Sequence, residues 1–216
     1  TFFVLASLAS LTWAFAGVLN PAMSQLHAFV SEYSARDQPW RYLFQTTDVI
    51  MGTLLCLAGL ATLVWARHRP LGRQGWSGVG FVAGGFFSVL DALVTMDCSP
   101  TRSQACMAAE EAGHVSVNHI VHVGTSTIVV VGFALPILLL NSTMTRFRGF
   151  GLVVTWAWVV FTLLNGIGAV GWFVGTPMDY TGIWQRFSLG LGTLWWLILA
   201  ADDIVTARVQ DRARSC

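Results

Sequence analysis

The stretch of residues 115–140 reads VSVNHIVHVGTSTIVVVGFALPILLL and contains no Asp, Glu, Lys or Arg. An α-helix needs about 20 predominantly apolar residues to cross a bilayer, and this stretch exceeds that length. The chain has six predominantly apolar stretches of this kind, at approximately 1–19, 43–66, 76–96, 115–140, 150–174 and 183–201. The sequence therefore predicts an all-α polytopic membrane protein with a six-transmembrane-helix bundle, in which residues 1–216 form a single integral membrane domain.

The composition also indicates a membrane protein. Hydrophobic residues make up 55% of the chain and charged residues only 11%, whereas soluble domains have roughly a quarter charged residues. The net charge of +1 and the absence of a Lys/Arg cluster argue against nucleic acid as a partner. All 12 basic residues are Arg, so functions that require a lysine, such as a retinal Schiff base, are excluded.

The arginines are distributed unevenly between the two sides of the predicted bundle. Most fall in two short connections and the C-terminal tail: Arg67, Arg69, Arg73, Arg146, Arg148, Arg208, Arg212 and Arg214. Because cytoplasmic loops are enriched in Lys and Arg, this side is predicted to be cytoplasmic, with both termini on it. Residues 1–19 count as a span and not as a cleaved signal peptide, since an even number of spans requires them. The longer connections 20–42, 97–114 and 175–182 are then extracytoplasmic.

Two cysteines lie in the same predicted extracytoplasmic loop. Cys98 and Cys106 are eight residues apart, and that face of the membrane is oxidising, so we expect a disulfide between them. A redox-active pair, as in membrane thiol oxidases, is the alternative. The chain has no Cys-x-x-Cys motif and no second outer cysteine pair to support it.

Polar and ionisable side chains interrupt five of the six predicted spans. Such residues are costly in a bilayer and usually face the interior of a helix bundle. At 1.5 Å per residue most of them lie within roughly 5–10 Å of the outer boundary, and Asn165 lies somewhat deeper. The set comprises Asp48, Asp91, His119, His122, Asn165 and Arg186. It predicts a polar site in the half of the bundle nearer the outer leaflet.

Helical spacing places several of these side chains on faces that are rich in small residues. Two stripes repeat at intervals of three or four residues: Gly80, Gly84, Ser88 and Asp91 in one span, and Asp48, Gly52, Cys56 and Gly59 in another. Stripes of this kind let helices approach closely, so both aspartates are expected at packing faces. A polar arc on the fourth span contains Asn118, His119, His122, Thr125 and Ser126.

Three interpretations of this polar site are open from the sequence. In the first, Asp48 or Asp91 forms a buried ion pair with Arg186, and both histidines are hydrogen-bonded core residues. In the second, His119, His122 and Asp91 hold a zinc-like divalent metal. A metal-bound water would then attack a lipid headgroup, with Asp48 as a further catalytic residue. In the third, a cavity binds lipid without catalysis.

Further candidate binding residues surround these positions. They are Asn118, Ser126, Asn165, Arg186, His27 and Glu32. His27 and Glu32 belong to the first outer loop, which is amphipathic enough to lie over the site. Haem is not expected, because ligation of a b-type haem normally takes histidines on facing helices.

Several segments together resemble the six-span integral membrane family catalogued as domain of unknown function 998. They are Ser31-Glu32-Tyr33-Ser34-Ala35, Pro39-Trp40-Arg41-Tyr42-Leu43, Met96-Asp97-Cys98-Ser99-Pro100, His119-Ile120-Val121-His122 and Gly182-Ile183-Trp184-Gln185-Arg186-Phe187. The resemblance implies a six-helix bundle in the plasma membrane. A weaker similarity is to the ceramidase and progestin-receptor class of metal-dependent hydrolases. These use His-x-x-x-His, whereas this chain has His-x-x-His, in the fourth span instead of the last.

These observations lead to one functional expectation with two alternatives. We expect a multi-pass membrane protein whose polar outer-leaflet cavity binds or processes a lipid headgroup, so membrane lipids are the expected partners. The first alternative is a non-catalytic accessory subunit of a larger membrane complex, with membrane-protein partner subunits. A small transporter is disfavoured because the inner halves of the spans are mostly apolar. Whether the protein is an enzyme is left open by the sequence.

Overall fold

The structure is a computed structural model that describes residues 2–67, 72–173 and 180–215. Within these residues the regular structure is helical without a strand, and six helices are long and apolar enough to cross a membrane. The predicted all-α bundle of six transmembrane helices is therefore confirmed. Arg69 and most of the third predicted outer loop lie outside the described residues.

The order of the helices follows the predicted spans. The first span is divided into α1 (Phe2–Ser10), the 3-10 helix η1 (Leu11–Phe15) and α2 (Ala16–Leu19). The other spans are α3 (Arg41–Ala66), α4 (Arg73–Leu93), α6 (Val117–Leu139), α7 (Arg148–Phe173) and α8 (Thr181–Ser215). Three short helices, η2 (Val30–Ser34), α5 (Gln104–Glu111) and η3 (Leu140–Ser142), complete the chain.

Two spans differ from their predicted form. α8 continues to Ser215 instead of ending near residue 201, because no Gly or Pro interrupts the polar segment that follows. The first span is not a continuous α-helix, and hydroxyl groups explain where it changes. Ser10 Oγ donates to the carbonyl of Ser7 and Thr12 Oγ1 to that of Ala9, both at 2.9 Å. Hydroxyls bonded to the preceding turn compete with the helical backbone hydrogen bonds.

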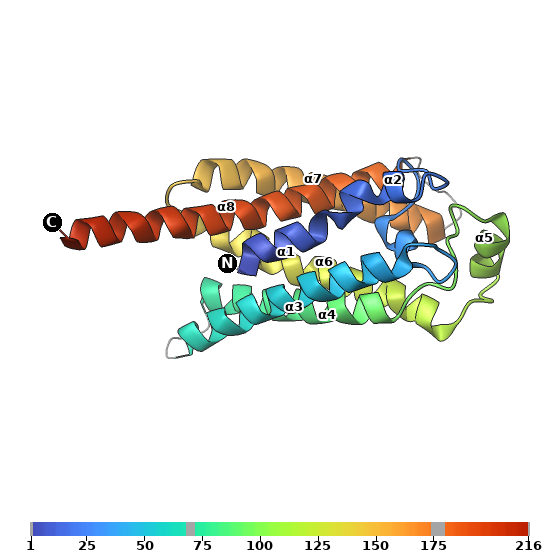
Figure 1. Cartoon of the computed structure of the whole chain (residues 1–216), viewed down its shortest axis with the longest axis horizontal. Helices are drawn as coiled ribbons and strands as arrows, with labels where there is room; N and C mark the ends of the chain where they lie inside the picture. Colours follow the sequence, from blue (N-terminus) through green and yellow to red (C-terminus); the bar gives the residue numbers. More distant parts are fainter. Residues whose placement is uncertain (1, 68–71, 174–179, 216) are drawn as a thin grey trace.

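The spans form two packed groups (Figure 1). α3, α4 and α6 make one group, α7 and α8 make the other, and α1 contacts both α3 and α8. In the first group the helices meet at glycines. A Cβ atom at Gly85 would lie 2.4 Å from the carbonyl oxygen of Gly52, and one at Gly80 would lie 2.6 Å from that of Gly132. The small-residue stripes are thus confirmed as packing faces.

Both termini lie toward the same end of the bundle (Figure 1), where polar side chains join the helices. Asn141 Nδ2 donates to Thr155 Oγ1 at 2.7 Å, and Trp195 Nε1 donates to Asn141 Oδ1 at 3.2 Å. The Asp202 carboxylate accepts the backbone N–H groups of residues 145–147 just before α7, at 2.7–3.2 Å. These bonds connect η3, α7 and α8 and close this end of the bundle.

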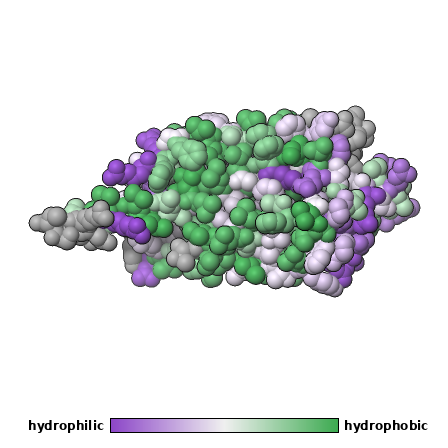
Figure 2. Space-filling view, turned by 45° about the horizontal axis from the view of Figure 1, so that its top comes forward, coloured by the Kyte–Doolittle hydropathy of each residue, from purple (hydrophilic) through white to green (hydrophobic). Residues whose placement is uncertain are grey.

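The other end of the bundle is covered by residues 20–40 and 94–116, which we call the cap (right-hand side of Figure 1). On the face drawn in Figure 2, hydrophobic residues cover most of the middle of the bundle, and hydrophilic residues lie mainly toward its two ends. Arg67, Arg73, Arg146 and Arg148 flank the helix ends opposite the cap. Which end faces the cytoplasm stays a prediction.

Candidate functional site

Glu32 connects the two segments of the cap. Its side chain is fully buried. One carboxylate oxygen accepts hydrogen bonds from Ser99 Oγ at 2.5 Å, Thr101 Oγ1 at 2.6 Å and Thr101 N at 3.1 Å. The other oxygen accepts from Phe29 N at 2.9 Å. Burial raises the pKa of Glu32 above its ordinary value, although these four donors act in the opposite direction.

Arg186 connects the cap to α8. Its Nη1 atom donates to the carbonyls of Gln25 at 2.8 Å and Ala28 at 2.9 Å, and Nη2 donates to Tyr33 Oη at 3.3 Å. Gly182, one turn earlier, makes room for the cap, because a Cβ there would lie 2.5 Å from the Ala28 carbonyl oxygen. Among the described residues no ion pair joins Arg186 to an aspartate, so the first of the three interpretations is wrong for this side chain.

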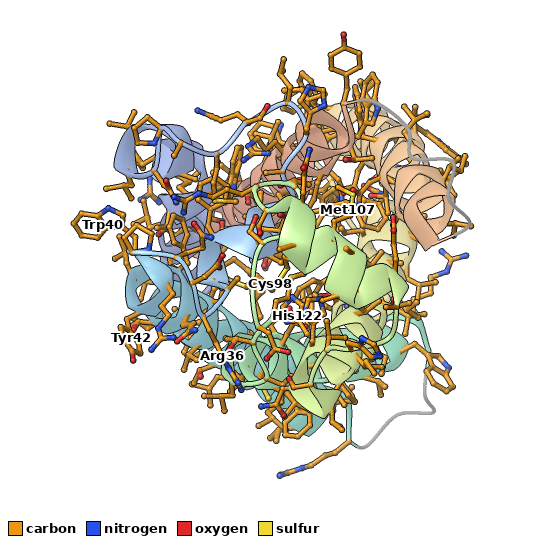
Figure 3. All side chains as sticks on the ribbon, turned by 90° about the vertical axis from the view of Figure 1, so that its right-hand side faces the viewer. Arg36, Trp40, Tyr42, Cys98, Met107 and His122 are labelled. Carbon is orange, nitrogen blue, oxygen red and sulfur yellow. A yellow bond between two sulfur atoms is a disulfide. The ribbon has the colours of Figure 1, made fainter. Side chains whose placement is uncertain are left out.

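Asp97 and a disulfide fix the second cap segment. Asp97 pairs with Arg36 at 3.3 Å and accepts hydrogen bonds from Ser116 N at 2.6 Å and Ser116 Oγ at 2.7 Å, at the start of α6. Burial acts to raise the pKa of Asp97, but these hydrogen bonds and the Arg36 charge outweigh it and lower that pKa. The predicted Cys98–Cys106 disulfide is present, with a Cα–Cα distance of 6.0 Å. It holds α5 across the end of the bundle, above His122 (Figure 3).

Asp91 and His122 tie the end of α4 to α6. The His122 Nδ1 atom lies 3.1 Å from the carbonyl oxygens of Asp91 and Val94 and 3.2 Å from Asp91 Oδ1. Because all three neighbours are acceptors, Nδ1 carries the proton and caps the C-terminal end of α4. The Asp91 carboxylate also accepts hydrogen bonds from Thr125 Oγ1 and Ser126 Oγ. This cluster therefore holds two helices in register.

His119 has a different set of contacts. Its Nδ1 atom accepts the backbone N–H of Asp97 at 3.3 Å, and its Nε2 atom lies 3.9 Å from Glu110 Oε1 on α5. No group of three His, Cys, Asp or Glu side chains in the described parts of the chain is arranged to hold a metal ion. The predicted metal ligands His119, His122 and Asp91 thus do not form a metal-binding group. The Nδ1 atom of each histidine has a structural partner, whereas both Nε2 atoms are buried without a hydrogen-bond partner among the described residues.

Three other predicted site residues lie apart from this cluster. Asn118 is exposed on α6. His27 is exposed in the cap, where its ring stacks on Tyr180 at 5.5 Å between centroids. Asn165 is half-buried on α7, and its Oδ1 atom has no hydrogen-bond partner among the described residues. The residues predicted as one site therefore belong to different parts of the bundle.

An internal cavity of about 130 Å³ lies between the two helix groups, beneath the cap. It is lined by the first span, α3, α6, α7 and α8, and by Val30 of the cap. Asp48 is the ionisable residue in the lining, which otherwise is mostly apolar with a few hydroxyl groups. The hydroxyl-bearing residues Ser10, Thr12, Ser188 and Thr193 were missed by sequence reasoning. Their presence inside the first and sixth spans was the signal that could have found them.

Asp48 is half-buried on α3 and differs from Glu32, Asp91 and Asp202 because its side chain has no partner. No hydrogen bond or ion pair joins it to another described residue. Two tryptophans of the cavity lining, Trp13 and Trp196, have buried indole N–H groups that find no acceptor in the described residues. Buried polar groups are nearly always hydrogen-bonded, so the polar groups around this cavity are unusual.

Most of the segments that carry the family resemblance lie in the cap or contact it. Glu32, Asp97 and Ser99 lie in the cap, and Gly182 and Arg186 hold the cap on α8. In comparisons with known proteins, the family model described as "Protein of unknown function (DUF998)" matches residues 3–202. No curated protein and no solved structure matched the chain. Because the family model covers nearly the whole sequence, this six-helix chain belongs to the DUF998 family.

Proposed function

We propose that this protein binds a membrane lipid whose headgroup carries a primary ammonium, and that Asp48 is the group that recognises it. The observation that carries the proposal is the unpartnered Asp48 carboxyl in a mostly apolar cavity. An ionised carboxylate inside a membrane protein is costly unless it is paired. A ligand ammonium supplies both the charge and the hydrogen-bond donors that the protein does not.

The size of the cavity favours a headgroup over a whole lipid. Its volume is about 130 Å³, whereas pockets for complete small-molecule ligands usually measure about 300–1,000 Å³. An apolar cavity of about 150 Å³ holds one benzene molecule. The space beside Asp48 therefore suits a compact polar group, with the acyl chains outside it. Trp13 and Trp196, whose buried indole N–H groups have no partner among the described residues, also belong to the lining.

Binding is better supported than hydrolysis. The residues that resemble a catalytic pair, Asp91 and His122, are occupied in joining α4 to α6 and do not line the cavity. Transport is also less well supported, because the hydrogen bonds of Asn141 and Asp202 close the end opposite the cap. The accessory-subunit alternative rests on the exposed apolar face of α7, which contact with lipid alone explains equally well.

The orientation and location are part of the proposal. The cap would face the outside of the plasma membrane, so that the cavity opens toward the outer leaflet. Two observations support this orientation. The first is that the arginines at the ends of α3 and α7 lie opposite the cap, as the enrichment of cytoplasmic loops in basic residues predicts. The Cys98–Cys106 disulfide within the cap also suits an oxidising compartment.

Native mass spectrometry of the detergent-purified protein tests the proposal. Phosphatidylethanolamine, phosphatidylcholine and phosphatidylglycerol with identical chains are added, because only the first carries a primary ammonium. The Asp48→Asn variant keeps the shape of the side chain, and Asp203→Asn, at an exposed position on α8, is the matched control. We expect Asp48→Asn to weaken phosphatidylethanolamine binding by about tenfold or more, equivalent to about 1.4 kcal/mol, while the control binds as the wild type does. Equal binding of all three lipids, or an unchanged affinity in Asp48→Asn, would overturn it.

A further inference from the structure

We propose that an acyl chain of the bound lipid lies in a groove on the outside of the bundle, between the first span and α3, and that this groove joins the Asp48 cavity at Thr12. The inference rests on the proposed function and adds the route by which the lipid reaches the cavity. The groove has a volume of about 330 Å³ and is lined by side chains of the first span together with Leu43 of α3. Thr12 is the polar residue in its lining.

The groove and the cavity are adjacent along both helices that form them. Thr12 lines the two spaces. On α3, Leu43 lines the groove, whereas the next residue, Phe44, and Asp48 one turn later line the cavity. The two spaces therefore lie on two sides of η1 and the first turns of α3, and Thr12 belongs to both linings. A lipid with its headgroup at Asp48 has a short path for its chain past Thr12.

The 3-10 geometry of η1 shapes the wall between them. In a 3-10 helix, side chains three residues apart lie directly above one another, unlike those of an α-helix. Thr12 and Phe15 therefore form one row, and both line the groove. Trp13, the residue after Thr12, belongs to the cavity lining.

The position of the groove favours one occupant. Phe15 is 62% exposed and Val18 is 81% exposed, and both lie on a helix that is long and apolar enough to span the membrane. Hydrocarbon therefore surrounds the groove. The single hydroxyl of Thr12 lies where the chain would join the polar part of the lipid. An acyl chain fits this distribution of polarity, with one polar group at the inner edge.

Two probes separate this inference from the proposed function. Dilauroyl phosphatidylethanolamine has the headgroup with chains, and glycerophosphoethanolamine has the headgroup without them. Leu11→Trp and Leu43→Trp fill the groove from its two walls without changing a residue of the cavity lining. Leu163→Trp, at a 60% exposed position on α7, is the matched control for an added indole on the lipid-facing surface.

We expect the groove variants to weaken binding of the dilauroyl lipid about tenfold or more and to leave binding of the chainless headgroup unchanged. Asp48→Asn should weaken both probes, and Leu163→Trp neither. If the groove variants bind the dilauroyl lipid as the wild type does while Asp48→Asn still weakens it, the chain lies elsewhere and this inference fails. If Asp48→Asn also has no effect, the proposed function fails with it.

Photocrosslinking keeps the test valid should a groove variant fold poorly. A phosphatidylethanolamine with a diazirine in its acyl chain is irradiated with the wild-type protein, and the labelled peptides are sequenced. We expect labelling in residues 8–19 and at Leu43. Labelling confined to α7, or a dimer that leaves residues 8–19 unlabelled because a second copy covers the groove, would overturn the proposal.

Discussion

Replacing Arg186 by methionine should release residues 20–35 of the cap from α8. Methionine keeps an apolar stem but leaves the buried Ala28 carbonyl and the partly buried Gln25 carbonyl without their donor, and Tyr33 loses a hydrogen bond. A buried acceptor left unsatisfied costs about 1–3 kcal/mol and a lost hydrogen bond about 1 kcal/mol, so the substitution should cost about 3–5 kcal/mol. In a chain of this size, this loss lowers the melting temperature by about 10 °C.

The assay is the thermal unfolding of the detergent-solubilised protein, followed by the fluorescence of its 10 tryptophans. Arg102→Met is the control, because Arg102 is exposed and makes one hydrogen bond to Gln38 at 3.2 Å. Hydrogen–deuterium exchange should show faster exchange in residues 20–35 of Arg186→Met alone. A melting temperature within about 2 °C of the wild type, with unchanged exchange in this segment, would refute the assignment of Arg186 as the anchor of the cap.

Two further predictions concern the cap and the helix packing. Burial raises the pKa of Glu32 in the folded protein above its ordinary value of 4.5, so the associated stability is fully present below that value and is lost as the pH rises through the raised pKa. The melting temperature of the wild-type protein should therefore fall as the pH rises through the raised pKa of Glu32. The Glu32→Gln variant should not show this fall. Gly85→Ala should lower the melting temperature because its Cβ would lie 2.4 Å from the Gly52 carbonyl oxygen, costing about 1–3 kcal/mol. Gly124→Ala, with open space around its Cβ, should not.

The fold was predictable from the sequence because hydropathy depends on composition over about 20 residues. The glycine stripes likewise identified the packing faces of α3 and α4, since spacing along one helix determines which residues share a face. The 3-10 segment in the first span was not predicted. Its cause is a local competition between the hydroxyls of Ser10 and Thr12 and the backbone, which mean hydropathy does not register.

The candidate site was predicted only in part. The distance of each residue from the end of its predicted span placed Asp48, Asp91 and His122 in the half of the bundle beneath the cap, where the structure also has them. It could not show that Asp91 faces α6 whereas Asp48 faces the cavity, because the relative rotation of two helices depends on tertiary packing. One of the three interpretations also paired Arg186 with an aspartate, since nothing local indicates that residues 20–35 fold back to offer their carbonyls.

The position of α1 between the two helix groups affects how the protein is assembled during synthesis. Its Ser7 and Ser10 bond to Thr193 on α8 at 3.4 and 2.9 Å, across 186 and 183 residues of sequence. α3, α4 and α6 are successive spans and can pack together as soon as they are inserted. α1 is inserted before them, yet its contacts with α8 form only when α8 has left the ribosome. α1 can therefore pack on α3 early, but its packing is complete only after α8 is inserted, because contacts between distant residues form slowly.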